Sequence, residues 1–200
     1  MSKKVLILTA DAGDSYEALY AYQRLLEADW EPVIAAPSRR RLHLLIHDTE
    51  PGWDTYIERL GHCIDADVAV TAVAARDFAA LLIIGGRAPE YLRNDPSVLS
   101  LAREFAEQKK CIGAIGHGIQ ILTAAELIRD KTVTCHPHVQ VEVEAGGGHY
   151  TGKGATRDGN LVTAQSWRYH PEFYREFFDC LNGRAAAPPV RGGLHLFSRE

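Results

Sequence analysis

Residues 111–122 read Cys-Ile-Gly-Ala-Ile-Gly-His-Gly-Ile-Gln-Ile-Leu, an apolar run that stops at a Gly-His-Gly step before a helical pattern begins. This order predicts a buried strand, a sharp turn and a helix, which is the geometry of a nucleophile elbow. The residue at the apex of such an elbow adopts a strained conformation that projects its side chain above the sheet, and the next backbone N–H points at a developing oxyanion. The apex residue here is Gly116, which has no side chain to project.

Similar apolar runs recur on both sides of this elbow. Residues 5–10, 32–36 and 79–84 are each followed by a segment with helical spacing, residues 161–163 form a late strand, and residues 171–181 form a closing helix. Runs that are continuous rather than alternating indicate a parallel sheet covered on both faces. The predicted fold class is therefore α/β: a doubly wound sandwich with a mainly parallel sheet and helices on both faces.

The stretch from Leu42 to Val73 breaks this rhythm. It alternates in polarity and contains the turn residues Pro51-Gly52 and Gly61, so we expect an inserted antiparallel hairpin. At 200 residues the chain has room for one domain, placed at residues 1–183, and a C-terminal extension at residues 184–200. Within that extension, residues 194–197 are a candidate edge strand or subunit contact.

Charge and targeting signals narrow the function classes. The 22 Lys and Arg residues against 26 Asp and Glu residues give a net charge of -4, which disfavours a nucleic-acid partner. No apolar run approaches the ~20 residues that span a bilayer, and the N-terminal apolar run is too short for a signal peptide. The four cysteines lack Cys-x-x-Cys spacing, which suits reduced thiols in the cytoplasm better than disulfides.

Ligands of open α/β sheets bind outside the carboxyl ends of the strands. Three loops follow predicted strands here: residues 11–15, 85–90 and 116–118. The glycines of the second loop lack Gly-x-Gly-x-x-Gly spacing, so no dinucleotide cofactor is indicated. We expect neither a cofactor nor a metal site.

The elbow and several other motifs resemble the PfpI-type intracellular protease and ThiJ superfamily, which includes the Parkinson-disease protein and shares the class I glutamine-amidotransferase-like fold. Within it, the chain is most similar to the plant-type glyoxalase-like branch. The resemblance covers about residues 4–182 and rests on the following segments: Tyr16-Glu17, Ile46-His47-Asp48, Thr55-Tyr56, Gly61-His62, Gly85-Gly86-Arg87-Ala88-Pro89-Glu90-Tyr91-Leu92, His117-Gly118 and His170-Pro171-Glu172-Phe173.

The resemblance implies a cysteine before the elbow histidine and a glutamate from the first loop that tunes its thiolate. Matched by position, the cysteine falls on Gly116 and the glutamate on Asp14. Gly116 reflects either natural divergence or an engineered replacement, and a second difference at Asp14 favours divergence. Glycine cannot be a nucleophile, acid or base, so the covalent route that the family uses has no attacking atom.

The resemblance also implies that Glu90 reaches His117 from a neighbouring subunit, which makes a homo-oligomer (dimer, trimer or hexamer) the expected assembly. Backbone N–H groups at Gly86 and His117 would still cradle an anion, because main-chain donors do not depend on the lost side chain. The candidate catalytic residues are His117, Asp14 and Glu90, and the candidate ligand-binding residues are Gly86, Arg87, Gly116, His117 and Cys135.

Each candidate also has a structural interpretation. Asp14 in a Gly-Asp-Ser loop is either a base or a helix N-cap. His117 is either a general base or a structural histidine. Cys135 in Cys135-His136-Pro137-His138 is a candidate replacement nucleophile, although this spacing matches no zinc pattern.

Three hypotheses remain. The first is a family member that has lost cysteine-dependent protease or glyoxalase activity, a pseudoenzyme that keeps a pocket for a small carbonyl or carboxylate ligand or serves a stress-response binding role. The second is an active hydrolase, glyoxalase or deglycase on small aldehyde, amide or glycated substrates, using Asp14, His117 and water, or Cys135. The third is a chaperone-like assembly with a vestigial pocket.

Overall fold

The computed structural model describes residues 3–184, and the candidate strand or contact at residues 194–197 lies outside them. A seven-stranded sheet forms the centre, with the order β10-β11-β7-β6-β1-β2-β5. Its strands are β1 (Lys4–Leu8), β2 (Glu31–Ala36), β5 (Val68–Ala69), β6 (Ala80–Ile83), β7 (Cys111–Ile115), β10 (Ala155–Asp158) and β11 (Leu161–Ala164). All neighbouring pairs are parallel except β10 with β11, which confirms the mainly parallel α/β fold.

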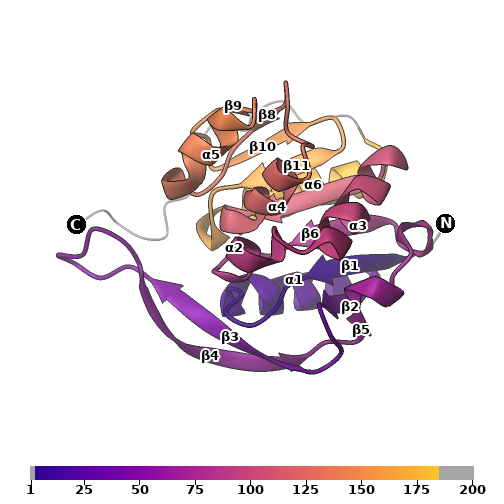
Figure 1. Ribbon diagram of the computed structural model, residues 1–200, viewed down its shortest axis with the longest axis horizontal. Coiled ribbons are helices and arrows are strands. Elements are labelled where there is room, and N and C mark those ends of the chain that lie inside the picture. Colours follow the sequence, from indigo (N-terminus) through magenta and orange to yellow (C-terminus); the bar gives the residue numbers. More distant parts are fainter. Residues whose placement is uncertain (1–2, 185–200) are drawn as a thin grey trace.

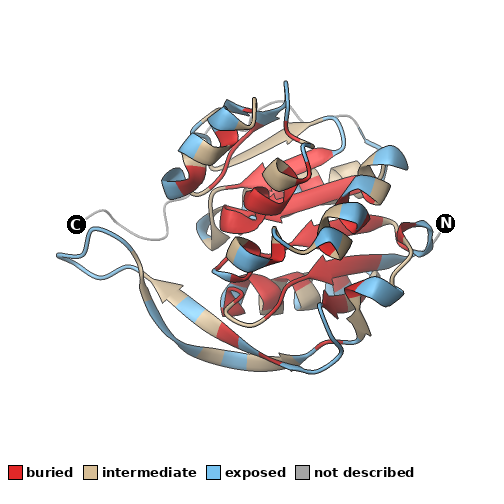
Figure 2. Cartoon of the chain, in the orientation of Figure 1, coloured by how far each residue is buried: buried red, intermediate tan, exposed pale blue. Residues whose placement is uncertain are grey.

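Helices cover both faces of this sheet (Figure 1). One face packs against α1 (Ser15–Glu27) and α6 (His170–Leu181), and the other against α2 (Ala88–Leu92), α3 (Pro96–Glu107), α4 (Ile119–Ala124) and α5 (Gln140–Ala145). Side chains of β1 alternate between the two layers. Val5 and Ile7 pack in the core beneath α1 and α6, and Leu6 and Leu8 pack in the core beneath α2 to α5. Figure 2 shows the buried residues concentrated in the sheet and on the inner sides of these helices.

The predicted hairpin is present but shorter than expected. Its strands are β3 (Arg41–Asp48) and β4 (Ile57–Asp65), which pair antiparallel in a separate two-stranded sheet, and its tip extends beyond the body of the molecule (Figure 1). The hairpin occupies residues 41–65, so it ends before the predicted stretch does. The chain instead returns to the main sheet at β5, because Val68 and Ala69 pair with the end of β2.

Several short elements had no clear pattern in the sequence. They are β8 (Thr132–Val133) and β9 (His149–Tyr150), which form a small parallel sheet, together with α5 and β10. Among residues 3–184, no helix has both the length and the apolar character needed to cross a lipid bilayer.

Candidate active site

The elbow forms as the sequence predicts. β7 ends at Ile115, a single 3-10 turn covers Gly116–Gly118, and α4 follows. Gly116 has φ +57°, in the left-handed region that glycine enters without strain. A Cβ built there would lie 3.5 Å from the Gln165 backbone oxygen and 3.8 Å from Glu17 Oε1, both ordinary contact distances. The apex is therefore open enough to accept a side chain that the protein lacks.

The carboxyl group that faces this apex belongs to Glu17, in the first turn of α1. Its Oε2 accepts a hydrogen bond from the Gly85 N–H at 2.8 Å, and the residue is only 3% exposed. Burial, together with the charge of Asp14, raises the pKa of the Glu17 carboxyl well above its usual value. The surroundings of Glu17 thus favour its protonated, carboxylic-acid form.

The assignment of the elbow glutamate to Asp14 is therefore wrong. Glu17 holds that place, because Asp14 occupies the N-cap of α1, where its Oδ1 accepts the Glu17 N–H at 2.8 Å. Glu17 therefore takes the place that the resemblance assigned to Asp14, and Asp14 gives no support to natural divergence at Gly116.

Asp14 nevertheless lies in the site. It is 3% exposed, and its Oδ2 is 2.9 Å from Nδ1 of His47, which comes from β3. Since an ionised carboxylate can only accept, Nδ1 of His47 carries the proton. The Nε2 of His47 lies 3.5 Å from Glu58 Oε1. The hairpin thus supplies a histidine to the site. The sequence analysis did not name His47 as a candidate site residue, although Ile46-His47-Asp48 is one of the segments that carry the resemblance.

His117 lies beside the rings of Tyr56 and His136. It stacks on His136 with ring centroids 4.9 Å apart, and Tyr56 contacts both rings edge-on. Burial, with smaller contributions from His136, His47, His138 and Arg87, lowers the pKa of His117 to about 3. Burial likewise lowers the pKa of His136 to about 4, with His138 and His47 adding to the shift. Both imidazoles are neutral at pH 7, which makes His117 a weak general base.

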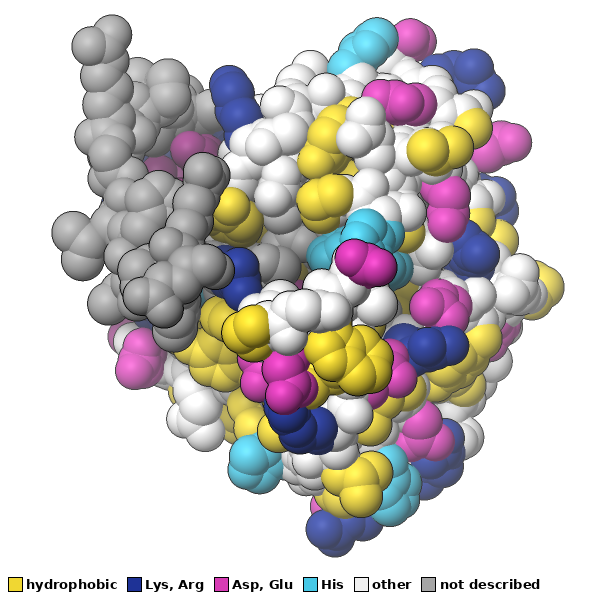
Figure 3. Space-filling model, turned by 90° about the vertical axis from the view of Figure 1, so that its left-hand side faces the viewer, with side chains coloured by type: hydrophobic (Ala, Val, Ile, Leu, Met, Phe, Trp, Pro, Cys, Tyr) yellow, Lys and Arg dark blue, Asp and Glu magenta, His cyan; other side chains and the backbone are white. Residues whose placement is uncertain are grey.

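A cavity of about 350 Å³ opens above the apex. Figure 3 views the face that carries the hairpin tip and shows histidine side chains gathered beside hydrophobic and acidic ones. Four of the candidates line the cavity: Asp14, Gly86, Gly116 and His117. The lining residues that the sequence did not single out as candidates include Glu17, His47, Tyr56, Gln165, Trp167 and Arg168.

Gly86 approaches the first loop more closely than any side chain would permit. It has φ +77°, and a Cβ would meet the Asp14 nitrogen at 2.5 Å. Within residues 3–184, no hydrogen bond from the Gly86 amide is found. This amide is consistent with the predicted anion cradle.

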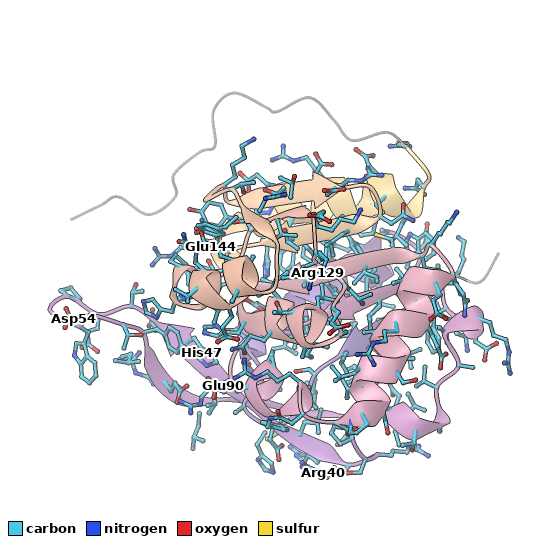
Figure 4. All side chains as sticks on the ribbon, turned by 45° about the horizontal axis from the view of Figure 1, so that its top comes forward. Arg40, His47, Asp54, Glu90, Arg129 and Glu144 are labelled. Atoms are coloured by element: carbon cyan, nitrogen blue, oxygen red, sulfur yellow. The ribbon has the colours of Figure 1, made fainter. Side chains whose placement is uncertain are left out.

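Arg87 and Glu90 are not part of the cavity wall. Arg87 pairs with Glu90 at 3.4 Å and with Glu58 at 3.5 Å, and both residues are partly exposed on this chain. Figure 4 shows His47 and Glu90 where the hairpin meets α2, with Asp54 at the far end of the hairpin. The structure therefore does not bring Arg87 to a ligand in this cavity, and a contact from Glu90 to a neighbouring subunit stays a prediction.

Cys135 is also absent from the cavity wall, contrary to the expectation that it binds a ligand. Its side chain is fully buried in the hydrophobic core, and burial raises the pKa of its thiol to about 12. A thiol of that kind is protonated and inaccessible, so Cys135 is not suited to act as a nucleophile. Its neighbours His136, Pro137 and His138 do line the cavity.

Metal ligands do not converge in the described part of the chain. Among residues 3–184, no three His, Cys, Asp or Glu side chains are arranged to hold an ion. The histidines of the cavity stack on one another or meet edge to face, as His136 and His138 do with ring centroids 4.6 Å apart.

Comparison with known proteins agrees with this geometry. A sequence profile of the DJ-1/PfpI family matches residues 3–179. The chain is 34% identical to Protein DJ-1 homolog D of Arabidopsis thaliana over 187 residues, covering 90% of this chain but 48% of that protein. It is 30% identical to Deglycase PH1704 of Pyrococcus horikoshii over 162 residues, covering 81% of this chain and 89% of that one.

The solved structures agree as well. A crystal structure of a two-domain protein from Anabaena variabilis, with dj-1/thij/pfpi-like and ferritin-like domains, superposes with a TM-score of 0.80 and 26% identity. The match covers 96% of this chain and 52% of that one. The chain thus spans about half the length of this protein and of the Arabidopsis relative.

Proposed function

The chain belongs to the DJ-1/PfpI family, and from this membership we propose that it is a member without cysteine-dependent protease or glyoxalase activity, whose cavity binds a small carbonyl or carboxylate compound. The observation that carries the proposal is the elbow itself. The turn is present, Glu17 is buried beside it, and Gly86 lies close to the first loop, while Gly116 offers no nucleophile. A reaction that begins with attack by an elbow thiol has no starting atom here.

The cavity retains groups suited to a small oxygen-bearing ligand. The Gly86 amide is an available donor in the described structure, and the protonated carboxyl of Glu17 faces the open apex. Neutral His117 and the ring of Tyr56 line the same space. Polar groups that converge on one hollow beside aromatic side chains are typical of small-molecule sites.

The experiment that tests this proposal is direct ligand binding. Pyruvate and glyoxylate, which carry a carbonyl and a carboxylate, are titrated against the protein by ligand-observed NMR and calorimetry. The Gly116→Ala substitution places a methyl group in the open apex and should weaken binding at least tenfold. Gly159 provides the matched control, since it has φ +59° and nothing within 4 Å of a Cβ, so Gly159→Ala adds the same backbone strain away from the cavity.

Absence of saturable binding for both probes would contradict the proposal. Binding that is equally strong in Gly116→Ala and Gly159→Ala would also contradict it, because the ligand would then not use the apex.

A second candidate is an active hydrolase, glyoxalase or deglycase that acts on small aldehyde, amide or glycated substrates with water as the nucleophile. It is favoured by Asp14 and His117 lining one cavity and by the similarity to a protein named a deglycase. The burial of Cys135 disfavours the hypothesis that this thiol is the nucleophile. Methylglyoxal turnover that disappears in Asp14→Asn and persists in Cys135→Ser would favour this candidate.

We also propose that the site is completed in a homo-oligomer of two, three or six copies, with Glu90 contacting His117 of a neighbour. Glu90 is partly exposed on this chain, which supports such a contact. The four free thiols support a reducing, cytoplasmic location. Light scattering on wild type and Glu90→Gln gives the assembly size and tests the role of this side chain.

A further inference from the structure

Two buried carboxyl groups lie one helical turn apart beneath the open apex. Asp14 and Glu17 are each 3% exposed, both line the cavity, and they are linked by the hydrogen bond from the Glu17 N–H to Asp14 Oδ1. A family member that works through a thiol needs only one carboxyl beside the sulfur. Both carboxyl groups belong to the lining of the open space, as do His47 and His117.

The surroundings of Glu17 favour its protonated form. The backbone N–H groups of Gly85 and Trp167 both hydrogen-bond this carboxyl, the first at Oε2, and these two bonds by themselves lower its pKa. Oε1 lies 3.8 Å from the position of a Cβ on Gly116. Burial and the neighbouring charge of Asp14 outweigh these hydrogen bonds and raise the pKa of this carboxyl, which favours the form that has a proton to donate.

The surroundings of Asp14 are those of a carboxylate. Both of its oxygens accept hydrogen bonds, one from the Glu17 N–H at 2.8 Å and one from His47 Nδ1 at 2.9 Å. These donors fix the orientation of the group and balance its negative charge. A pair of carboxyl groups with opposite protonation in one site is the arrangement that assigns an acid and a base.

The missing Cβ gives a ligand access to this pair. An atom at the position of that Cβ would lie 3.8 Å from Glu17 Oε1. A ligand oxygen is smaller than a methyl carbon, so it can approach Oε1 more closely than this. A carbonyl oxygen can therefore enter where a thiol would otherwise stand. Tyr56, Trp167 and His117 line the same cavity.

We propose that Asp14 and Glu17 act as base and acid on an α-hydroxycarbonyl compound and exchange its α-proton through an enediol, which interconverts the aldehyde and ketone forms. This inference rests on the proposed function, because it requires that the cavity bind a small carbonyl compound.

The step balances without a further reactant. Asp14 removes the proton from the carbon next to the carbonyl, the electrons of that C–H bond form the C=C bond, and Glu17 transfers its proton to the carbonyl oxygen. Asp14 then returns its proton to the former carbonyl carbon, while Glu17 takes the proton of the neighbouring hydroxyl, which becomes the new carbonyl. Both residues end in their starting forms, and nothing is oxidised overall.

The test uses dihydroxyacetone as the probe in D₂O, followed by proton NMR. The wild-type protein should incorporate deuterium at the carbon that exchanges and should form glyceraldehyde faster than buffer alone. Glu17→Gln keeps an acceptor for the Gly85 N–H but has no acidic proton, and Asp14→Asn keeps an N-cap but has no base. Each should lower the exchange rate by at least about 100-fold, the usual contribution of a positioned acid or base.

Asp95 provides the control. It caps α3 as Asp14 caps α1, with its side chain accepting the Ser97 N–H at 2.8 Å, but it does not line the cavity. Asp95→Asn should leave the exchange rate unchanged. Thermal unfolding of all three variants establishes that they are folded.

Binding of dihydroxyacetone, measured separately by saturation-transfer NMR, distinguishes the two proposals. A probe that binds without exchange above the buffer rate overturns the acid–base pair and leaves the binding proposal standing. Exchange that survives in both Glu17→Gln and Asp14→Asn also overturns the pair. A cavity that binds neither dihydroxyacetone nor the carboxylate probes contradicts the proposed function, and this inference with it.

Discussion

Oε1 of Glu17 lies 3.8 Å from the position that a Cβ on Gly116 would occupy. The other oxygen of this carboxyl is fixed by the Gly85 N–H, and a Cβ on Gly85 would meet it at 2.9 Å. Two glycines and one glutamate therefore form a closely fitted unit around the apex. This unit holds the carboxyl group of Glu17 within contact distance of any side chain placed at residue 116.

The first prediction is that Gly116→Cys creates a reactive thiol with a pKa below the ~8.5 of free cysteine. The new Cβ has only ordinary contacts at 3.5 and 3.8 Å, and the protonated Glu17 can donate a hydrogen bond to the thiolate. Because Glu17 is already in place, no second substitution is required. The pH dependence of alkylation by iodoacetamide measures the pKa, and methylglyoxal consumption measures any gain of glyoxalase activity.

The control for this experiment is Gly159→Cys, at a turn with nearly the same backbone conformation and open surroundings. Both variants should lose about 1–2 kcal/mol of stability, because a residue with a Cβ is placed at positive φ. Only the Gly116 variant should show a lowered pKa and turnover. An ordinary thiol pKa in folded Gly116→Cys would show that the apex no longer supports a thiolate.

The second prediction concerns the dual role of Asp14. Removal of an N-cap costs about 1 kcal/mol, and Asp14→Ala should cost about 1 kcal/mol more than Asp95→Ala, because the buried Nδ1–H of His47 also loses its acceptor. Urea unfolding of both variants gives the comparison. Equal losses in the two variants would mean that the His47 contact contributes nothing to stability, and Asp14→Ala in a His47→Ala background isolates that contribution.

The central strands could be predicted because their residues are buried on both faces. In β1, Val5 and Ile7 face one helical layer and Leu6 and Leu8 the other, so the run is apolar throughout. Strand β10 has partly exposed residues, among them Arg157 and Asp158, and within residues 3–184 it pairs with β11 alone. It therefore has no hydrophobic signature, and its position became clear only from the folded structure.

The elbow could be predicted from its glycines, but the acid beside it could not. Asp14 and Glu17 are one turn apart at the start of α1 and lie on the same side of that helix. Linear position does not tell which of them faces Gly116. The choice depends on where α1 begins, because the residue at the N-cap directs its carboxylate to the helix amides and the next turn presents Glu17 to the apex.

The third prediction is that His117 does not titrate near neutrality. Burial lowers its pKa to about 3, so the imidazole stays neutral from pH 5 to pH 8. The ring Cε1–H resonance, assigned by its loss in His117→Asn, should have no titration midpoint in that range. A midpoint near 6.5 would show that the ring is open to water, and pyruvate binding would then strengthen as the pH falls.

The fourth prediction is that His170→Phe stabilises the protein, most strongly in acid. His170 is 2% exposed, stacks on Tyr20 at 4.6 Å, and neither of its ring nitrogens has a partner within the described residues. Replacing unsatisfied nitrogens by carbon should add about 1 kcal/mol at pH 7.

The acid dependence of this gain follows from linkage. Burial lowers the pKa of His170 from 6.5 to about 3. Between these two pH values the imidazole is protonated in the unfolded chain and neutral in the folded chain. Folding stability is therefore lost as the pH falls from 6.5 towards 3, and at pH 5 this one residue accounts for about 2 kcal/mol of the loss. His170→Phe removes that contribution, so its advantage over wild type in urea unfolding should grow from about 1 kcal/mol at pH 7 to about 3 kcal/mol at pH 5. His149→Phe, which replaces an exposed histidine, should show no such growth. An advantage that is the same at both pH values would mean that the folded protein admits a proton at His170, and that this ring is less shielded from water than its packing against Tyr20 indicates.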